Sequence, residues 1–334
     1  MISFIQRGAQ MMALKTYTYR NRWVSPGAMA MFITMVILAS SSAMAETAVR
    51  EKSFASPQQA VTALVAAVHD NNDAELLAIL GPGSQDLISS GDKVADQNGR
   101  ARFLKAYVDK NALEQEDNGH ATLFIGVKDY PFPIPIVRQG NAWFFDTQAG
   151  MEEILNRRIG RNELHTIEVM QVYTDAQREY AAMKRNGGGP KFAQKFASSE
   201  GKKDGLHWEA GEGEEESPFG PLIARATEEG YADGLDEDSP EPFHGYYFKI
   251  LKAQGEHANG GAFDYVADAK MVLGFALVAY PAKYGASGIM TLIVNQEGVI
   301  YEKDLGEETA TVAAAMATFD PDDTWRKYEE SIEQ

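Results

Sequence analysis

The sequence contains no cysteine among its 334 residues. Without thiols the chain forms no disulfide bonds and offers no thiolate as a nucleophile or a metal ligand. It also lacks a Gly-x-Ser-x-Gly, His-Glu-x-x-His or Ser-x-x-Lys motif in a context that would support catalysis. We therefore expect a binding protein without a metal ion or cofactor, and we keep an enzyme as the alternative.

Long apolar segments are scarce as well. Beyond the first 45 residues, no segment reaches the ~18 apolar residues that a membrane span requires. The N-terminal region has the pattern of a secretory signal peptide: Lys15, Arg20 and Arg22 precede an apolar segment at 28–38, and Ala43-Met44-Ala45 forms an A-x-A cleavage site. We expect cleavage after Ala45 and a periplasmic product. An uncleaved N-terminal anchor is the alternative.

Basic residues are outnumbered, with 31 Lys and Arg against 48 Asp and Glu, so the net charge is −17. Cleavage after Ala45 would remove four basic residues and no acidic ones, which lowers the charge to −21. Such a chain repels phosphate backbones and anionic lipid surfaces. We expect its partner to be an envelope protein or a small ligand, and neither nucleic acid nor a membrane.

The first half of the mature chain, residues 46–161, begins with helices and continues with strands. Ser56 is placed to cap a helix that has Pro57 at its first position and an apolar stripe through Val68. Two further helices are expected at 73–80 and 94–110, followed by strands at 121–127, 134–137 and 142–145. This α+β order is similar to NTF2-like domains, which hold a pocket between their helices and a curved antiparallel sheet.

The second half, residues 162–334, is expected to pack one long helix on an antiparallel sheet. Asn162 is predicted to cap this helix, and Asn186-Gly187-Gly188-Gly189-Pro190 to end it and form a connector. A short helical turn at 192–196 and a helix at 221–229 follow. Apolar segments then predict strands at 246–251, 263–266, 273–280, 289–294 and 299–303, and an Ala-rich helix is expected at 308–319.

Two clusters of charge invite a functional interpretation. Arg157, Arg158 and Arg161 predict either an anion or carboxylate site, or surface arginines that pair with acids across the domain junction. The acidic segment 233–241 predicts either a calcium site or a solvated loop, and it lacks the spacing of an EF-hand.

His244 is the best single candidate for chemistry, because it enters a strand beside aromatic residues in His-Gly-Tyr-Tyr-Phe. One hypothesis is an exported hydrolase that uses His244 with Asp146 or Asp264 at the domain interface. The alternative is a hydrogen-bonded structural histidine. Three tyrosines are candidates for lining a ligand site or forming part of the core: Tyr246, Tyr280 and Tyr284.

Several stretches together resemble one family of exported bacterial proteins, the domain of unknown function 2950. They are Phe54-Ala-Ser-Pro57, Leu87-Ile-Ser-Ser-Gly-Asp92, Tyr130-Pro-Phe-Pro-Ile-Pro135, Glu153-Ile-Leu-Asn-Arg-Arg-Ile-Gly-Arg-Asn-Glu163, Asp175-Ala-Gln-Arg-Glu-Tyr180, His244-Gly-Tyr-Tyr-Phe248 and Ala279-Tyr-Pro-Ala-Lys-Tyr-Gly285. The resemblance covers nearly all of the mature chain and implies no activity, because the family is uncharacterised.

The second half is also similar to the head domains of pilins and pseudopilins. The similarity rests on Ala176-Gln-Arg-Glu-Tyr180, Gly245-Tyr-Tyr-Phe248, the turn at 280–288 and the hairpin at 294–300. Pilins assemble through an apolar N-terminal helix behind a prepilin cleavage site, which this chain lacks. We therefore expect a pilin-like head without polymerisation, within a non-enzymatic binding or envelope-assembly module.

Overall fold

A computed structural model describes residues 51–183, 190–211, 213–231 and 240–329. The predicted signal peptide, the predicted connector at 187–189 and most of the acidic segment 233–241 lie outside the described residues. Within them, no helix combines the length and the apolar character that crossing a membrane requires.

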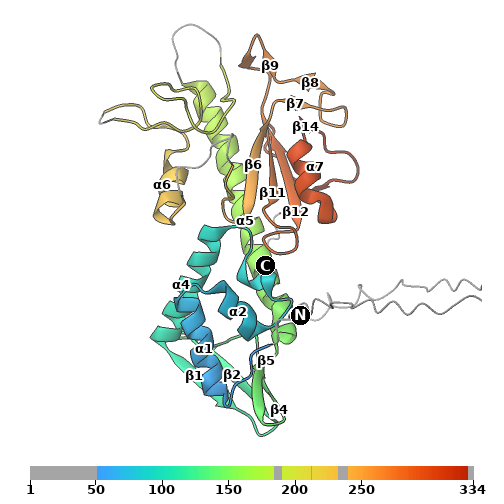
Figure 1. Ribbon diagram of the computed structural model, residues 1–334. Coiled ribbons are helices and arrows are strands. Elements are labelled where there is room, and N and C mark those ends of the chain that lie inside the picture. The colour runs from blue at the N-terminus through green and yellow to red at the C-terminus, as the bar shows by residue number, and fades with distance from the viewer. Residues whose placement is uncertain (1–50, 184–189, 212, 232–239, 330–334) are drawn as a thin grey trace, which may run out of the picture. The chain divides into compact units, whose positions relative to one another are not determined.

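The first part of the fold places helices on an antiparallel sheet (Figure 1). Its helices are α1 (Pro57–His69), α2 (Asp73–Leu80), α3 (Gln85–Ile88) and α4 (Lys93–Asp109). Its strands are β1 (Asn111–Gln115), β2 (His120–Ile125), β3 (Tyr130–Pro131), β4 (Ile136–Gln139) and β5 (Ala142–Phe145). The strand order is β1-β2-β4-β5, and β3 also pairs with β2.

The start of α1 confirms the predicted cap, because the Ser56 hydroxyl accepts a hydrogen bond from the Gln59 backbone N–H at 3.2 Å. Strand β1 was not predicted. Its sequence, Asn-Ala-Leu-Glu-Gln, has neither the β-branched residues nor the aromatics that are typical of strands. Its pairing with β2, which puts Leu113 opposite Leu123, depends on a neighbour that the local sequence does not reveal.

Helix α5 (Thr147–Ala182) is one continuous helix of 36 residues. The predicted start at Asn162 is wrong: Asp146 caps the helix, and Asn162 lies buried inside it with its amide donating to the Ser287 carbonyl at 2.9 Å. A helix of this length spans about 54 Å. The predicted domain boundary between residues 161 and 162 therefore falls within a helix.

A second antiparallel sheet follows, with the strand order β15-β13-β12-β11-β6. Its strands are β6 (Tyr246–Leu251), β11 (Ala276–Pro281), β12 (Met290–Asn295), β13 (Tyr301–Asp304) and β15 (Arg326–Lys327). Short strands flank it: β7 (Ala253–Gln254), β8 (Phe263–Asp264), β9 (Val266–Ala267), β10 (Lys270–Met271) and β14 (Thr318–Phe319). The remaining helices are α6 (Gly220–Glu228), the 3-10 turn η1 (Gly306–Glu308) and α7 (Thr309–Ala315).

The predicted hairpin at 289–303 is confirmed by the antiparallel pairing of β12 with β13. The helical turn predicted at 192–196 is wrong, because Phe192 forms an isolated bridge with Met271 and no helix is present there. The tail helix α7 is also shorter than predicted.

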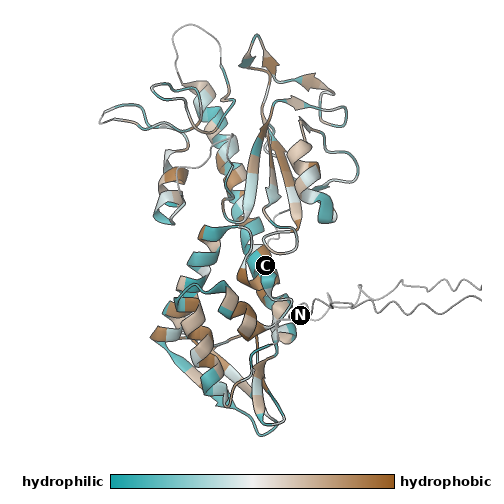
Figure 2. Cartoon of the chain, viewed as in Figure 1, coloured by the Kyte–Doolittle hydropathy of each residue, from teal (hydrophilic) through white to brown (hydrophobic). Residues whose placement is uncertain are grey.

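The buried apolar residues form two separate clusters. One lies between α1, α2 and the first sheet, and the other between α5, α6 and the second sheet; apolar residues gather in these elements in Figure 2. Helix α5 contributes to both, through Ile154 to the first cluster and through Met170 and Tyr173 to the second. The α+β class is thus confirmed, while the NTF2-like and pilin-like descriptions remain predictions.

Candidate functional site

A buried carboxylate, Asp92, joins segments that are far apart in the sequence. Its Oδ1 accepts the Ala95 N–H at 2.9 Å and so caps α4. Its Oδ2 accepts the Gly245 N–H at 2.8 Å and the Tyr231 hydroxyl at 3.0 Å. Burial raises the pKa of Asp92, and these three hydrogen bonds oppose the rise.

Gly245, one of the donors to Asp92, belongs to a tight turn formed by residues 243–246. We call it the His244 turn. The backbones of Phe243 and Tyr246 exchange two hydrogen bonds, of 2.8 and 3.1 Å. Both central residues have positive φ, 49° at His244 and 80° at Gly245, as a type I′ turn requires. Gly245 is needed for a second reason, because a Cβ there would lie 2.5 Å from Nδ2 of Asn162. The local sequence His-Gly thereby fixes the direction in which β6 begins.

The turn places the His244 ring in a nearly closed environment, with 12% of the side chain exposed. The ring lies edge-on to His165 of α5, with centroids 4.5 Å apart, and it also contacts Tyr231 and Phe243. Its Nε2 is 3.1 Å from Oε2 of Glu229, but the two groups are not aligned for a hydrogen bond. Burial is the main cause that lowers the pKa of His244 to about 4, so the ring is neutral at pH 7.

The segment before Asp92 is held from several sides. The Arg158 guanidinium donates to the Asp86 and Leu87 carbonyls at 2.6 and 2.7 Å. Arg100 donates to the Ile88 carbonyl at 3.0 Å. The Lys283 ammonium lies 2.5 Å from the Asp86 carboxylate. These contacts fix the backbone that carries Asp92.

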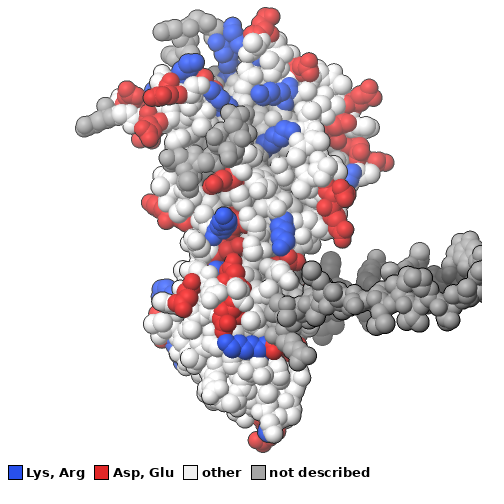
Figure 3. All heavy atoms as spheres, viewed as in Figure 1, with Lys and Arg blue, Asp and Glu red and all other residues white. Residues whose placement is uncertain are grey.

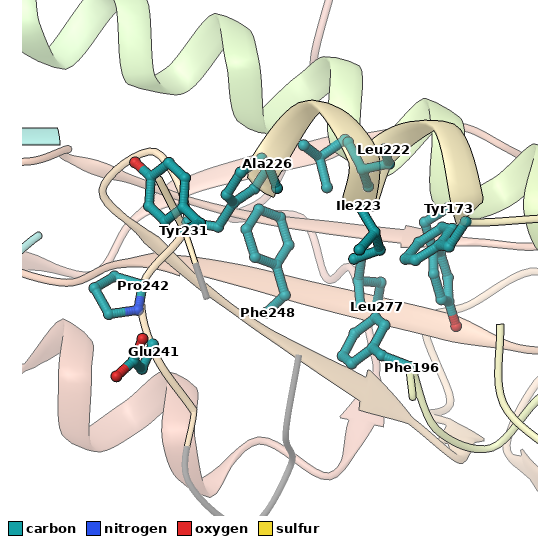
Figure 4. A pocket seen from close by; sticks show the side chains of 13 residues that line it. Tyr173, Phe196, Leu222, Ile223, Ala226, Tyr231, Glu241, Pro242, Phe248 and Leu277 are labelled. Carbon is teal, nitrogen blue, oxygen red and sulfur yellow. The ribbon is translucent and has the colours of Figure 1, made fainter. Parts of the chain in front are cut away.

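An apolar cavity lies beside the His244 turn, between α6 and the faces of α5, β6 and β11. In Figure 4, Leu222, Ile223 and Ala226 of α6 lie across from Phe248 and Leu277 of the sheet. The cavity measures about 30 Å³ and reaches the surface, since Ile223 and Phe248 are only half-buried. The described residues that line it are Val169, Tyr173, Phe196, Phe219, Leu222, Ile223, Ala226, Tyr231, Glu241, Pro242, Phe243, Phe248 and Leu277.

The three predicted arginines differ in their contacts. Arg157 pairs with Glu153 on the same helix, and Arg158 is used by the backbone carbonyls. Arg161 lies within reach of the Arg157 carbonyl at 3.5 Å, and burial lowers its pKa. Their partners include backbone carbonyls as well as an acid, and the anion site remains a prediction.

The predicted tyrosines do not line the cavity. Tyr246 is fully buried, and its hydroxyl donates to the Met290 carbonyl at 3.0 Å. Tyr280 packs against Tyr247 with ring centroids 5.5 Å apart. Tyr284 donates to the Asp304 carboxylate at 3.3 Å. Each lies in or beside the second sheet, and a ligand site there remains a prediction.

The carboxylates predicted to work with His244 lie elsewhere. Asp146 caps α5 by accepting the Ala149 N–H at 3.3 Å, and Asp264 is an exposed residue of β8. The carboxylate beside His244 is Glu229 instead. Within the described part of the chain, no group of three or more His, Asp or Glu residues is placed to hold a metal ion.

The sequence pointed to His244 but not to the residues around it. Glu229 ends an amphipathic helix and His165 lies inside a long one, so neither stands in a recognisable motif. Asp92 carried a detectable signal, because it follows Ser-Gly and precedes a helix, as an N-cap residue does. In the sequence, the apolar residues of α6 have the pattern of ordinary core residues.

On the face shown in Figure 3, acidic side chains lie along both edges of the second part of the fold. This pattern agrees with the net charge of −17.

Comparisons with known proteins give a family. A search of curated proteins and a search of solved structures found no match. Residues 51–328 match the model of a family described as "Protein of unknown function (DUF2950)". This match covers most of the chain and confirms the predicted family, so the chain belongs to the DUF2950 family.

Proposed function

We propose that this protein is an exported, non-catalytic binding protein that holds a small apolar ligand between α6 and the sheet strands β6 and β11. The observation that carries the proposal is the apolar cavity. Among the lining residues that the structure describes, Glu241 alone is charged. The hydroxyls of Tyr173 and Tyr231 are already engaged, donating to the Ala276 carbonyl and to Asp92. A ligand there gains mainly from burial of apolar surface.

The size of the cavity bears on how a ligand enters. About 30 Å³ is room for roughly two water molecules, whereas ligand pockets typically measure about 300–1,000 Å³. We therefore expect one end of an apolar ligand to occupy the cavity, and α6 to move outward for a larger one. Helix α6 has only 9 residues, and Leu222 and Ala226 are its buried residues.

Export is the second part of the proposal. It is supported by the basic residues, the apolar segment and the A-x-A site within the first 45 residues. A periplasmic binding protein then acts on a small envelope molecule or passes it to an envelope protein. In a variant of this proposal, the protein assembles with such an envelope protein. The lack of a recognised catalytic motif in the sequence is compatible with this variant as well.

The proposal is tested with a substitution on α6 that fills the cavity. Ala226 faces the cavity, so Ala226→Leu places three further carbons in it, while Ala224→Leu makes the same change on the exposed side of the same helix. We expect the neutral fluorescent probe N-phenyl-1-naphthylamine to bind the unaltered chain and Ala224→Leu equally. Ala226→Leu should weaken binding by at least about tenfold.

Circular dichroism on all three chains checks that each is folded. Equal probe affinity in Ala226→Leu and Ala224→Leu would show that the probe binds elsewhere. The absence of probe binding to the unaltered chain would contradict the proposal directly.

A hydrolase centred on His244 is the second candidate, and one observation favours it. A neutral imidazole next to the Glu229 carboxylate, at 3.1 Å, has the composition of a general base with its orienting acid. The aromatic rings of His165, Tyr231 and Phe243, however, pack against the His244 ring, and only 12% of its side chain is exposed to a substrate. Hydrolysis of p-nitrophenyl acetate that disappears in His244→Asn would favour the enzyme; we expect no turnover in either chain.

A further inference from the structure

Two imidazole rings face each other where α5, the end of α6 and the His244 turn meet. The ring planes of His165 and His244 cross at 65° with centroids 4.5 Å apart. Nδ1 of His165 and Nε2 of His244 are both sealed from solvent and have no hydrogen-bond partner. Buried polar atoms normally find partners, and two unpaired atoms in one contact call for a physical reason.

Charged groups approach this pair from three helices. From α6 and its C-cap come Arg225 and Glu229, and from α4 comes Arg102, whose charge disfavours a positive charge on His244. From α5, His165 faces the ring, and Glu168 lies 3.9 Å from Arg225. The Glu229 carboxylate lies 3.7 Å from Arg225, so it is shared between that guanidinium and His244.

Uncharged and more distant groups complete the surroundings. Tyr231 contacts the His244 ring and donates its hydroxyl to Asp92, so the Asp92 carboxylate is separated from His244 by the tyrosine. Phe243 covers another side of the ring, with centroids 4.2 Å apart. A proton on His244 would therefore face two arginines and a second imidazole, with Glu229 as its nearest carboxylate.

This arrangement penalises protonation in the folded state. Burial first, and then His165, Arg225 and Arg102, lower the pKa of His244 to about 4, compared with 6.5 for a free histidine. Because the pKa in the folded state is the lower one, an opened state binds the proton more readily. The contribution of His244 to stability is intact above about pH 6.5 and is lost as the pH falls toward about 4.

We propose that the His165–His244 pair is an acid-sensitive fastener, which holds α6 against α5 and the His244 turn at neutral pH and releases α6 in acid. The end of α6 is the element released, because Glu229 is its C-cap residue and Tyr231 follows two residues later. Asn98 of α4 also donates to the Glu229 carbonyl at 2.8 Å, so release of α6 separates it from α4 too. The inference goes beyond ligand binding and needs no ligand in the cavity.

Hydrogen exchange on the full chain, corrected for the intrinsic pH dependence of exchange, tests the fastener. Opening that exposes His244 moves its pKa from about 4 to about 6.5. The opening equilibrium of α6 should then be about 30-fold more favourable at pH 5.0 than at pH 7.5. Peptides of α1, which lies in the other apolar cluster, should change far less.

The decisive variant is His244→Asn, since Asn-Gly is the pair that type I′ turns prefer and the turn is thereby kept. In this variant the pH effect on α6 should fall to below threefold. The control His69→Asn removes a histidine whose side chain is 76% exposed and should retain the full effect. Retention of the effect in His244→Asn, or an equal rise in α1 of the unaltered chain, would overturn the proposal.

A second measurement decides the matter on the unaltered chain, whether or not the variant folds. NMR titration of the histidine rings should show His244 taking up its proton below about pH 5. Titration of His244 at or above pH 6.5 would overturn the proposal, because the folded state would then carry no penalty for the proton.

Discussion

Asp92 shows how one residue can join two parts of a chain. A buried carboxylate is costly unless its lone pairs are used, and here three donors use them: a helix N–H, a turn N–H and a tyrosine hydroxyl. Burial still dominates, so the pKa of Asp92 is raised. The ionised form therefore costs stability above that pKa, and the hydrogen bonds offset part of the cost.

Asp92→Asn is predicted to destabilise the fold. The amide keeps one acceptor oxygen and brings an NH₂ group, so it cannot accept from the Ala95 N–H on one side and from Gly245 and Tyr231 on the other. We expect the free energy of unfolding at pH 7 to fall by about 1–3 kcal/mol in urea titrations.

Asp109→Asn provides the control in the same helix, because Asp109 pairs with Lys105 near the surface. Its effect should stay within about 0.5 kcal/mol. Equal effects of the two substitutions would show that the hydrogen bonds of Asp92 contribute nothing specific.

The surroundings of helix α5 vary along its length, and two of its glycines show this. A Cβ at Gly150 would lie 2.3 Å from the Pro133 carbonyl oxygen, so the helix there approaches the backbone before β4 closely. A Cβ at Gly160 would meet nothing within 4 Å, and the residue is exposed. One glycine permits packing, and the other only weakens the helix.

Opposite effects of the same substitution are therefore predicted. Gly160→Ala should raise the free energy of unfolding by about 0.5–1 kcal/mol through helix propensity. Gly150→Ala should lower it by about 1–3 kcal/mol, because backbone must move to admit the methyl group. Thermal and urea unfolding measure both, and a stabilised Gly150→Ala chain would contradict the close approach.

Elements were predictable from sequence where local signals are strong. The Ser-Pro start of α1 and the hairpin of β12 and β13 follow from caps and turn residues and are confirmed. The start of α5 was misplaced because Asn162 has the chemistry of a cap, while Asp146, the true cap, ends an aromatic strand. Strand β1 was missed because its pairing with β2, and not its composition, makes it a strand.

The candidate site was less predictable than the elements. His244 stood out by its aromatic neighbours, but its contacts with His165 and Glu229 join positions up to 79 residues apart in the chain. Such contacts depend on how α5 and α6 pack on the sheet, which one sequence does not specify. The cavity was hidden for the same reason, since its lining consists of ordinary apolar core residues.

At the scale of the whole molecule, the described chain combines two apolar clusters with α5 shared between them. Polar contacts reinforce this link, through Asp92 to Gly245 and through Glu163 to the Ile289 and Met290 N–H groups at 3.0 Å. The cavity and the histidine pair lie on the side of α6, a short helix beside this link. We therefore expect function beside this link, at the short helix α6.

Native mass spectrometry of the full chain, purified from the cells that express it, tests the central claim most directly. The unaltered chain and Ala224→Leu should each carry a bound apolar molecule, which denaturing conditions release, and Ala226→Leu should be free of it. Equal occupancy in Ala226→Leu, or no bound molecule in the unaltered chain, would contradict a ligand site beneath α6.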